Sequence, residues 1–199
     1  MPARVRLAIF LASSFAIVAA AAVVFASGED RPSEPTAVRG ALRPPGIPPA
    51  DFRLVDERHA PVTLADLKGR PAVVTFLYTT CEDTCPLVAQ QIVGAMDRLG
   101  HDVPAVAIAV DPPRDTPARA RRFLAEQRAA GRIRFLTGPE RELRRLWRAF
   151  GIQRQSPRHE HSGYVVLLDR EGRQRIGFPA DRVTPDALAS DLALLERQG

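Results

Sequence analysis

Residues 72–86 read AVVTFLYTTCEDTCP, and this stretch decides the fold. Residues 72–77 form a short apolar run with several β-branched side chains, which is typical of a strand buried on both faces. Two cysteines, Cys81 and Cys85, follow this run. Pro86 suits the first turn of a helix, because a backbone N–H at that position has no helical partner. The stretch therefore predicts a strand, a cysteine-containing loop and a helix.

The residues after Pro86 support this helix. Apolar side chains recur there at helical spacing, at Val88, Ile92, Ala95, Met96 and Leu99. Gly100 follows them, where a glycine in the left-handed conformation commonly ends a helix. The helix is therefore expected to end at Gly100.

Strands and helices alternate through the rest of the folded part. Apolar runs predict strands at 103–110, 133–136, 164–168 and 174–178. The capping residues Thr116 and Thr184 each predict a helix, and acidic residues from Glu140 onward, followed by arginines, predict another because their charges match the helix dipole. A small β-hairpin is expected earlier, around residues 57–60. The order βαβαβαββα, with this N-terminal β-hairpin, predicts an α/β fold with a mixed central sheet flanked by helices. Ligand chemistry is expected at the carboxyl ends of its parallel strands, where both cysteines lie.

The N-terminal residues are typical of a membrane-targeting segment. Arg4 and Arg6 precede an apolar run over residues 7–26, which is long enough to span a bilayer. We therefore expect residues 1–27 to form an N-terminal anchor, with the domain on the outer, periplasmic or extracytoplasmic side of the cell membrane. A cleavable signal, which would leave a secreted or periplasmic protein, is the alternative. Residues 28–50 contain six prolines and predict an extended linker, and residues 51–199 the folded domain.

The charge balance is basic. The chain carries 28 basic and 23 acidic side chains, and 13 arginines but only four carboxylates lie between Arg114 and Arg158. Such a surface could dock an acidic partner or an anionic membrane, although a solvated basic face is the simpler interpretation. Aromatic residues make up only 6% of the chain, and no helix-turn-helix or zinc-finger spacing occurs. The sequence therefore predicts no nucleic-acid partner.

Cys81 and Cys85 are the only cysteines. In an exported protein a disulfide between them is the simplest expectation, but so short a ring would contribute only about 2 kcal/mol. Alternatively, N–H groups at the start of the helix stabilise the thiolate of Cys85 and also that of Cys81. A spacing of four places both sulfurs on one side of the helix, close enough to bridge or to share a metal.

A metal would need a further ligand, and there are four histidines: His59, His101, His159 and His161. Only the last two lie on a loop that enters a later strand of the same sheet. Two thiolates and one imidazole suit copper, whereas zinc normally takes a fourth ligand. Spacing alone leaves the choice of histidine open.

Residues 46–199 resemble the Sco/SenC family of copper-binding, thioredoxin-like proteins. Three motifs carry the resemblance: residues 76–86 around the cysteines, DPPRDTP at 111–117, and EHS at 160–162 followed by Leu168-Asp169 and Gly172. The resemblance implies a thioredoxin-like fold and one copper ion, Cu(I) or Cu(II), held by Cys81, Cys85 and His161. It implies a copper chaperone for the binuclear copper centre of cytochrome c oxidase, with the copper-bearing oxidase subunit or another copper chaperone as partner.

The motifs depart from the family pattern at two positions. Glu160 stands where the family usually has aspartate, which keeps the charge beside His161, and Pro113 replaces a residue that is commonly acidic. Asp111 and Asp115, like Glu160, are expected to support the ligands by hydrogen bonds or to contact a partner. A role in turns and caps explains the two aspartates equally well.

The sequence is also compatible with two other functions. A thiol-disulfide reductase would use Cys81 as the attacking thiolate and Cys85 as the resolving cysteine, acting on the cysteines of an oxidase subunit. Three residues, rather than two, separate Cys81 from Cys85, and Ser162-Gly163 stands where thioredoxins place a cis-proline. Both features argue against ordinary thioredoxin chemistry. A redox or copper sensor is the other alternative.

Overall fold

The computed structural model describes residues 37–152 and 163–198 of the 199-residue chain. The predicted anchor at residues 1–27 and the histidines His159 and His161 lie outside these ranges, as does Glu160. Within them, no helix combines the length and the apolar character that crossing a bilayer requires.

A six-stranded mixed sheet forms the centre of the domain, in the order β1-β8-β7-β4-β5-β6. The strands are β1 (Ala41–Leu42), β4 (Ala72–Leu77), β5 (Ala105–Ala109), β6 (Arg134–Leu136), β7 (Tyr164–Leu168) and β8 (Gln174–Pro179). Strands β4, β5 and β6 run parallel, whereas β7 and β8 form an antiparallel hairpin beside β4. All residues of β4 and β5 are buried, as their apolar runs predict. The mixed sheet of the sequence analysis is therefore confirmed.

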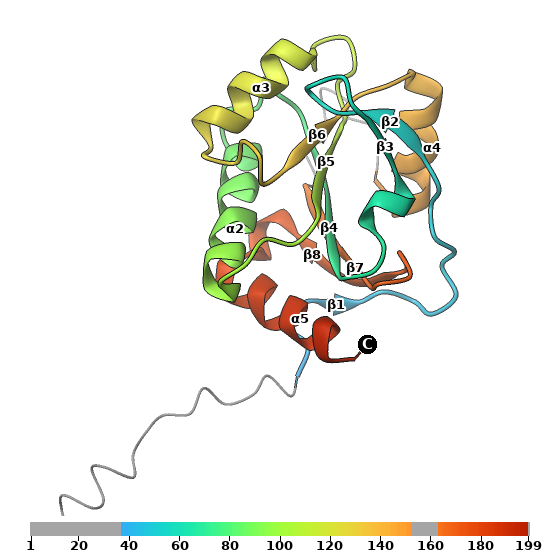
Figure 1. Ribbon diagram of the computed structural model, residues 1–199, viewed down its shortest axis with the longest axis vertical. Helices are drawn as coiled ribbons and strands as arrows, with labels where there is room; N and C mark the ends of the chain where they lie inside the picture. The colour runs from blue at the N-terminus through green and yellow to red at the C-terminus, as the bar shows by residue number, and fades with distance from the viewer. Residues whose placement is uncertain (1–36, 153–162, 199) are drawn as a thin grey trace, which may run out of the picture. The chain divides into compact units, whose positions relative to one another are not determined.

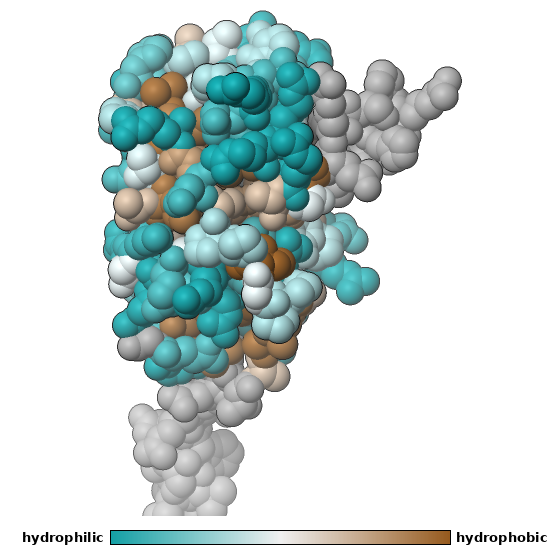
Figure 2. All heavy atoms as spheres, turned by 90° about the vertical axis from the view of Figure 1, so that its right-hand side faces the viewer, coloured by the Kyte–Doolittle hydropathy of each residue, from teal (hydrophilic) through white to brown (hydrophobic). Residues whose placement is uncertain are grey.

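Helices cover both faces of the sheet (Figure 1). On one side, α2 (Thr84–Leu99) packs against α5 (Pro185–Arg197), and α3 (Pro117–Glu126) lies beside the start of α2. On the other side are α4 (Glu140–Phe150) and the hairpin of β2 (Arg53–Val55) and β3 (Pro61–Thr63), which the short 3-10 helix η1 (Leu64–Leu67) follows. A second 3-10 helix, η2 (Ala180–Arg182), precedes α5. Figure 2 shows the α4 side, where hydrophilic side chains cover most of the described surface.

The predicted capping residues end or begin the helices as expected. The hydroxyl oxygen of Thr116 accepts a hydrogen bond from the Arg119 N–H at the start of α3, and Thr184 does the same for the Ala187 N–H in α5. Gly100 ends α2 in the left-handed conformation, with φ of 76°. Each interaction satisfies backbone groups that the helix itself leaves unpaired.

The segment before the domain differs from the sequence analysis, which assigned residues 28–50 to a linker. Ala41 and Leu42 pair with β8 as an edge strand, and the Asp191 carboxylate accepts hydrogen bonds from the N–H groups of Arg39 and Gly40. Asp191 is fully buried on α5. A strand of two residues shows no periodicity, which is why the sequence alone does not reveal it.

Candidate functional site

The cysteine loop begins where β4 leaves the sheet. The carbonyl oxygen of Leu77 accepts a hydrogen bond from Val110 at the end of β5, and the Cys81 N–H donates to the carbonyl of Tyr78. Helix α2 begins at Thr84, so its first turn contains both Cys85 and Pro86, as the sequence predicts for Pro86. Both cysteines are buried, with Cys81 9% and Cys85 4% exposed. The site therefore lies at the carboxyl end of a parallel strand, as predicted.

The two cysteines are not joined by a disulfide, and their sulfurs share a hydrogen bond. The backbone N–H of Cys85 also donates to the Cys81 sulfur, at 3.2 Å. The Cys85 thiol, the Tyr78 hydroxyl and backbone N–H groups lower the pKa of Cys81 to about 5, against the opposing effect of burial. Cys81 is therefore a thiolate at neutral pH. The disulfide expected between the two cysteines stays a prediction for the oxidised protein.

Cys85 behaves in the opposite way. Its pKa is raised, first because its thiol donates to Cys81, then because of burial and the nearby charges of Cys81 and Asp115. The expectation that the helix stabilises the thiolate of Cys85 before that of Cys81 is therefore wrong. Cys81 precedes the helix, so its sulfur receives the N–H of Cys85, whereas Cys85 supplies the proton between the two sulfurs.

Tyr78 is a site residue that the sequence analysis missed. Burial first, and then its hydrogen bond to Cys81, raise the pKa of the Tyr78 hydroxyl, so it remains a donor at neutral pH. The sequence carries only a weak signal for this role, because an aromatic residue at the end of a buried strand is usually part of the core. Its position three residues before Cys81, across one turn of the loop, is the only indication.

The Asp115 carboxylate forms hydrogen bonds with the cysteine loop and not with a cysteine sulfur. Its side chain is buried, and one carboxylate oxygen accepts hydrogen bonds from the N–H and the hydroxyl of Thr79, at 2.7 and 2.9 Å. The other oxygen accepts from the Asp111 N–H at 3.0 Å. Burial raises the pKa of Asp115 despite these donors. Asp111 itself, whose side chain is 13% exposed, pairs with the exposed Arg114, with Nε and Oδ2 2.5 Å apart.

The expected third ligand, His161, and its neighbours His159 and Glu160 lie outside the described residues. Gly163 is described, and a Cβ built on it would lie 3.5 Å from Cγ2 of Thr84, the residue before Cys85. The chain thus enters β7 directly beside the cysteine loop. In residues 37–152 and 163–198 no three histidine, cysteine or carboxylate side chains are grouped closely enough to hold a metal ion.

The two described histidines have other surroundings. His101 follows α2 at the end opposite the cysteines, and its Nε2 lies 2.8 Å from a carboxylate oxygen of Glu196. His59 lies in the turn between β2 and β3, with a positive φ of 66°. Neither histidine is grouped with the cysteines, so the structure leaves both out of the candidate site.

Together these features define a thioredoxin-like protein whose cysteine pair follows the central strand. The SCO1/SenC family model matches residues 43–195, and the chain therefore belongs to the SCO1/SenC family. The three motifs of the sequence analysis lead to the same family, which confirms that interpretation.

Individual relatives agree with the family match. Protein SenC of Rhodobacter capsulatus is 44% identical over 69 residues, which cover 33% of this chain and 31% of SenC. The chain spans 31% to 65% of the length of the first curated relatives it matches. Among solved structures, Bradyrhizobium japonicum ScoI with copper bound is 30% identical, with a TM-score of 0.63, over 74% of this chain and 98% of that one. Arabidopsis thaliana ScoI with copper bound is 25% identical, with a TM-score of 0.68, over 76% and 99%.

Proposed function

We propose that this protein is a copper chaperone that delivers copper to the binuclear copper centre of cytochrome c oxidase. Cys81, Cys85 and His161 would bind the ion. The observation that carries this proposal is the buried pair of free cysteines at the carboxyl end of β4 in an SCO1/SenC domain. The similar ScoI structures from Bradyrhizobium japonicum and Arabidopsis thaliana have copper bound.

The donor atoms suit this cargo. Sulfur ligands prefer soft ions such as Cu(I), and metal binding to thiols requires that they lose their protons. Cys81 is already a thiolate at neutral pH, so only the proton of Cys85 has to leave when copper enters. Gly163 beside Thr84 supports the third ligand, since two residues of chain span at most about 7 Å and His161 is two residues before Gly163.

The difference in burial gives the two cysteines different roles in transfer. Cys81 lines an open cleft that Cys85 does not reach. An incoming thiolate of the partner would therefore replace Cys81 or add beside it first, while Cys85 keeps its bond to the ion. Each exchange forms one copper–sulfur bond as another breaks. The partner would be the copper-bearing oxidase subunit or another copper chaperone.

The proposed location follows from the N-terminal sequence. Arg4, Arg6 and the apolar residues 7–26 support a single membrane pass with the domain on the outer side of the cell membrane. An exported location would also allow Cys81 and Cys85 to form a disulfide, which removes both sulfurs from copper binding. Reduction of that disulfide would then precede loading.

One observation favours thiol-disulfide reduction as a second candidate function. A cysteine with a pKa of about 5 beside a buried neutral cysteine is the arrangement of an attacking and a resolving thiol. The Cys81 thiolate would attack a disulfide of the client and release one client thiolate. Cys85, after losing its proton, would then attack Cys81, release the second client thiolate and leave the Cys81–Cys85 disulfide for an external dithiol to reduce.

Copper binding by the full chain in detergent micelles, reduced and under anaerobic conditions, tests the proposal. We expect the wild type to bind one equivalent tightly, and Cys81→Ser, Cys85→Ser and His161→Ala each to lose tight binding. His159→Ala is the matched control, because it removes a neighbouring imidazole and should bind as the wild type does. Binding that is unaffected by His161→Ala, together with rapid disulfide exchange, would instead support the reductase.

A further inference from the structure

An open cleft of about 540 Å³ separates the cysteine loop from α3, and Cys81 is the only one of the two cysteines that lines it. The wall formed by the loop includes Thr80 and Glu82. The opposite wall, formed by α3, includes Arg119, Arg122 and Phe123. Any protein that reaches the Cys81 sulfur through this cleft also meets the side chains of α3.

The α3 wall carries two arginines and one glutamate, Glu126, so its net charge is positive. Arg119 donates to the backbone carbonyl of Arg114 at 3.4 Å, which leaves its charge without a carboxylate among the described contacts. Arg122 lies 3.4 Å from Glu126, but their side chains are 75% and 57% exposed. Such a solvated pair contributes little energy and opens readily for another carboxylate.

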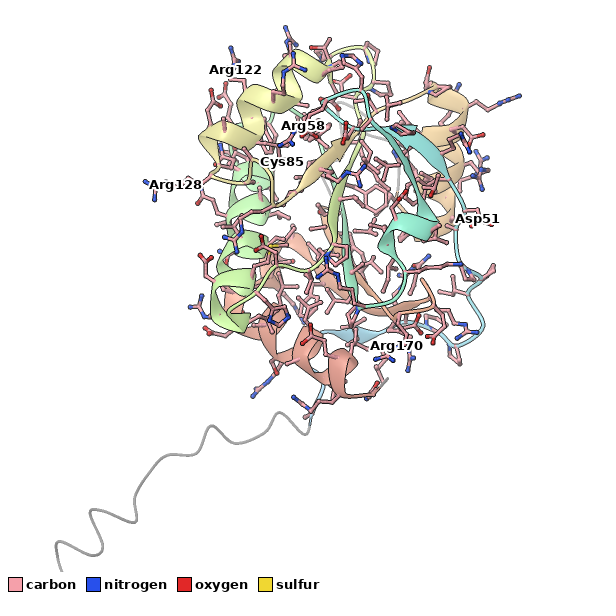
Figure 3. All side chains as sticks on the ribbon, viewed as in Figure 1. Asp51, Arg58, Cys85, Arg122, Arg128 and Arg170 are labelled. Carbon is pink, nitrogen blue, oxygen red and sulfur yellow. The ribbon has the colours of Figure 1, made fainter. Side chains whose placement is uncertain are left out.

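The positive charge extends beyond the cleft. From Arg114 to Arg128 the exposed charged side chains are five arginines and one glutamate, because Asp115 is buried. Figure 3 shows Arg122 and Arg128 projecting outward from the α3 side, with Cys85 at the adjoining end of α2. This surface attracts anionic groups toward the end of the sheet that carries the cysteines.

The loop wall has the opposite charge. Glu82 lines the cleft, and Asp83, which is exposed next to it, adds a second negative charge to the loop. Carboxylates of an occupant are therefore repelled from the loop and attracted to Arg119 and Arg122. The cleft thus favours one orientation of an acidic occupant, with its carboxylates on α3.

We propose that this cleft docks an acidic segment of the protein that exchanges copper with Cys81. Carboxylates of the segment pair with Arg119 and Arg122, and its metal-binding side chain points toward the Cys81 sulfur. The inference rests on the proposed function only for the cargo, since docking itself needs no copper. Opposite charges on the two surfaces accelerate encounter and select the partner.

The position of α3 favours a protein over a membrane surface as the occupant. The chain enters the domain through β1, which is one edge strand of the sheet, whereas α3 leads into β6, the opposite edge strand. Helix α3 is therefore not attached to the edge of the sheet at which the N-terminal segment joins the domain. A cleft with the cysteine in its lining admits a polypeptide segment, whereas lipid headgroups would contact the outer arginines without reaching Cys81.

Fluorescence anisotropy with the reduced, copper-free full chain in neutral detergent micelles tests the docking. The probe is a labelled peptide with a central serine pair, standing in for metal-binding cysteines, flanked by glutamates. A matched peptide carries glutamine at every glutamate position. We expect the acidic peptide to bind at least about ten-fold more tightly than its glutamine counterpart at low salt, and less so as salt screens the charges.

Paired substitutions locate the contact. Arg119→Gln combined with Arg122→Gln should weaken binding of the acidic peptide by about ten-fold. The control is Arg141→Gln combined with Arg144→Gln on α4, which removes the same charge at the same spacing, and Arg144 also has a glutamate partner, Glu140. This control should bind the peptide within about two-fold of the wild type.

Three outcomes would overturn the proposal: equal affinity for both peptides, equal weakening by the α3 and α4 pairs, or no weakening by the α3 pair. Anionic phosphatidylglycerol vesicles are tested beside the peptides, against the chain held in neutral lipid nanodiscs. Vesicle binding that requires Arg119 and Arg122, without binding of the acidic peptide, would assign the surface to a membrane. Because no copper is present, these outcomes do not depend on the metal-binding experiment above.

Discussion

The Asp115 carboxylate accepts both the backbone N–H and the hydroxyl of Thr79, at 2.7 and 2.9 Å. These bonds connect the loop after β5 to the loop after β4, two residues before Cys81. Asp115 is only 2% exposed. The buried Asp115 carboxylate thus accepts three hydrogen bonds. If a group with N–H donors of its own replaces one of the carboxylate oxygens, one of the three donors loses its acceptor.

We therefore predict that Asp115→Asn lowers the free energy of unfolding by about 1–3 kcal/mol. The amide can accept from Thr79, but its NH₂ group then faces the Asp111 N–H. Urea unfolding of the full chain measures the change. Asp111→Asn is the control and should cost less than about 1 kcal/mol, because the Arg114 side chain that pairs with Asp111 is 65% exposed and can be solvated instead. Equal costs for the two variants would contradict a special role for Asp115.

The second prediction concerns the Cys81 thiolate. In the reduced protein its ultraviolet absorbance should titrate with a midpoint near pH 5, and alkylation at about pH 6 should label Cys81 before Cys85. Tyr78→Phe removes one hydrogen bond to the sulfur and should move the midpoint upward. Cys85→Ala removes the largest contribution and should move it further.

Comparison of these variants gives a clear test. If Cys85 were alkylated first, or if Cys85→Ala left the midpoint near pH 5, the assignment of the thiolate to Cys81 would be wrong. Tyr164→Phe is a suitable control, because it removes a hydroxyl from β7 that interacts with neither sulfur. It should leave the midpoint unchanged.

The sequence predicts the fold well where local signals and burial agree. The apolar run of Ala72–Leu77 forms the central strand because β7 and β5 pair on either side of it. Thr116 and Thr184 cap helices because their side chains reach backbone N–H groups three residues away. Strand β1 escapes prediction because it depends on Asp191, about 150 residues further along the chain.

The site is predictable in its residue types but not in its proton positions. The spacing of Cys81 and Cys85 places their sulfurs together, yet their order along the helix axis decides which one accepts the N–H and which donates. The Tyr78 hydroxyl depends on the path of the loop, which a sequence does not specify. His161 lies outside the described residues, so its role as a ligand stays a prediction.

The third prediction is a pH-dependent contribution to stability from His101. Its pKa is raised, chiefly by the hydrogen bond to Glu196 that joins the end of α2 to α5. A histidine with a raised folded-state pKa stabilises the fold below its unfolded pKa, and this contribution is lost as pH rises through the folded value. We expect His101→Gln to cost about 0.5 kcal/mol near pH 5 and almost nothing near pH 9, since both side chains are partly exposed.

Urea unfolding at the two pH values measures this contribution. Glu196→Gln should remove the same pH-dependent part, and the double variant should cost no more than either single variant in that part. If the double variant lost the sum of the two single losses, His101 and Glu196 would act independently. A loss that grows with pH would have the wrong sign for this pair.

The last prediction concerns the strand that precedes the domain. Asp191→Asn should lower the free energy of unfolding by about 1–3 kcal/mol, because the carboxylate is fully buried and accepts the N–H groups of Arg39 and Gly40. Gly40→Ala should also detach β1, since a Cβ there would lie 2.5 Å from Ile176. Hydrogen exchange distinguishes this local effect from global destabilisation. The amides of residues 39–43 should lose protection in both variants while those of β4 keep it, and uniform loss across the sheet would contradict a local role for Asp191.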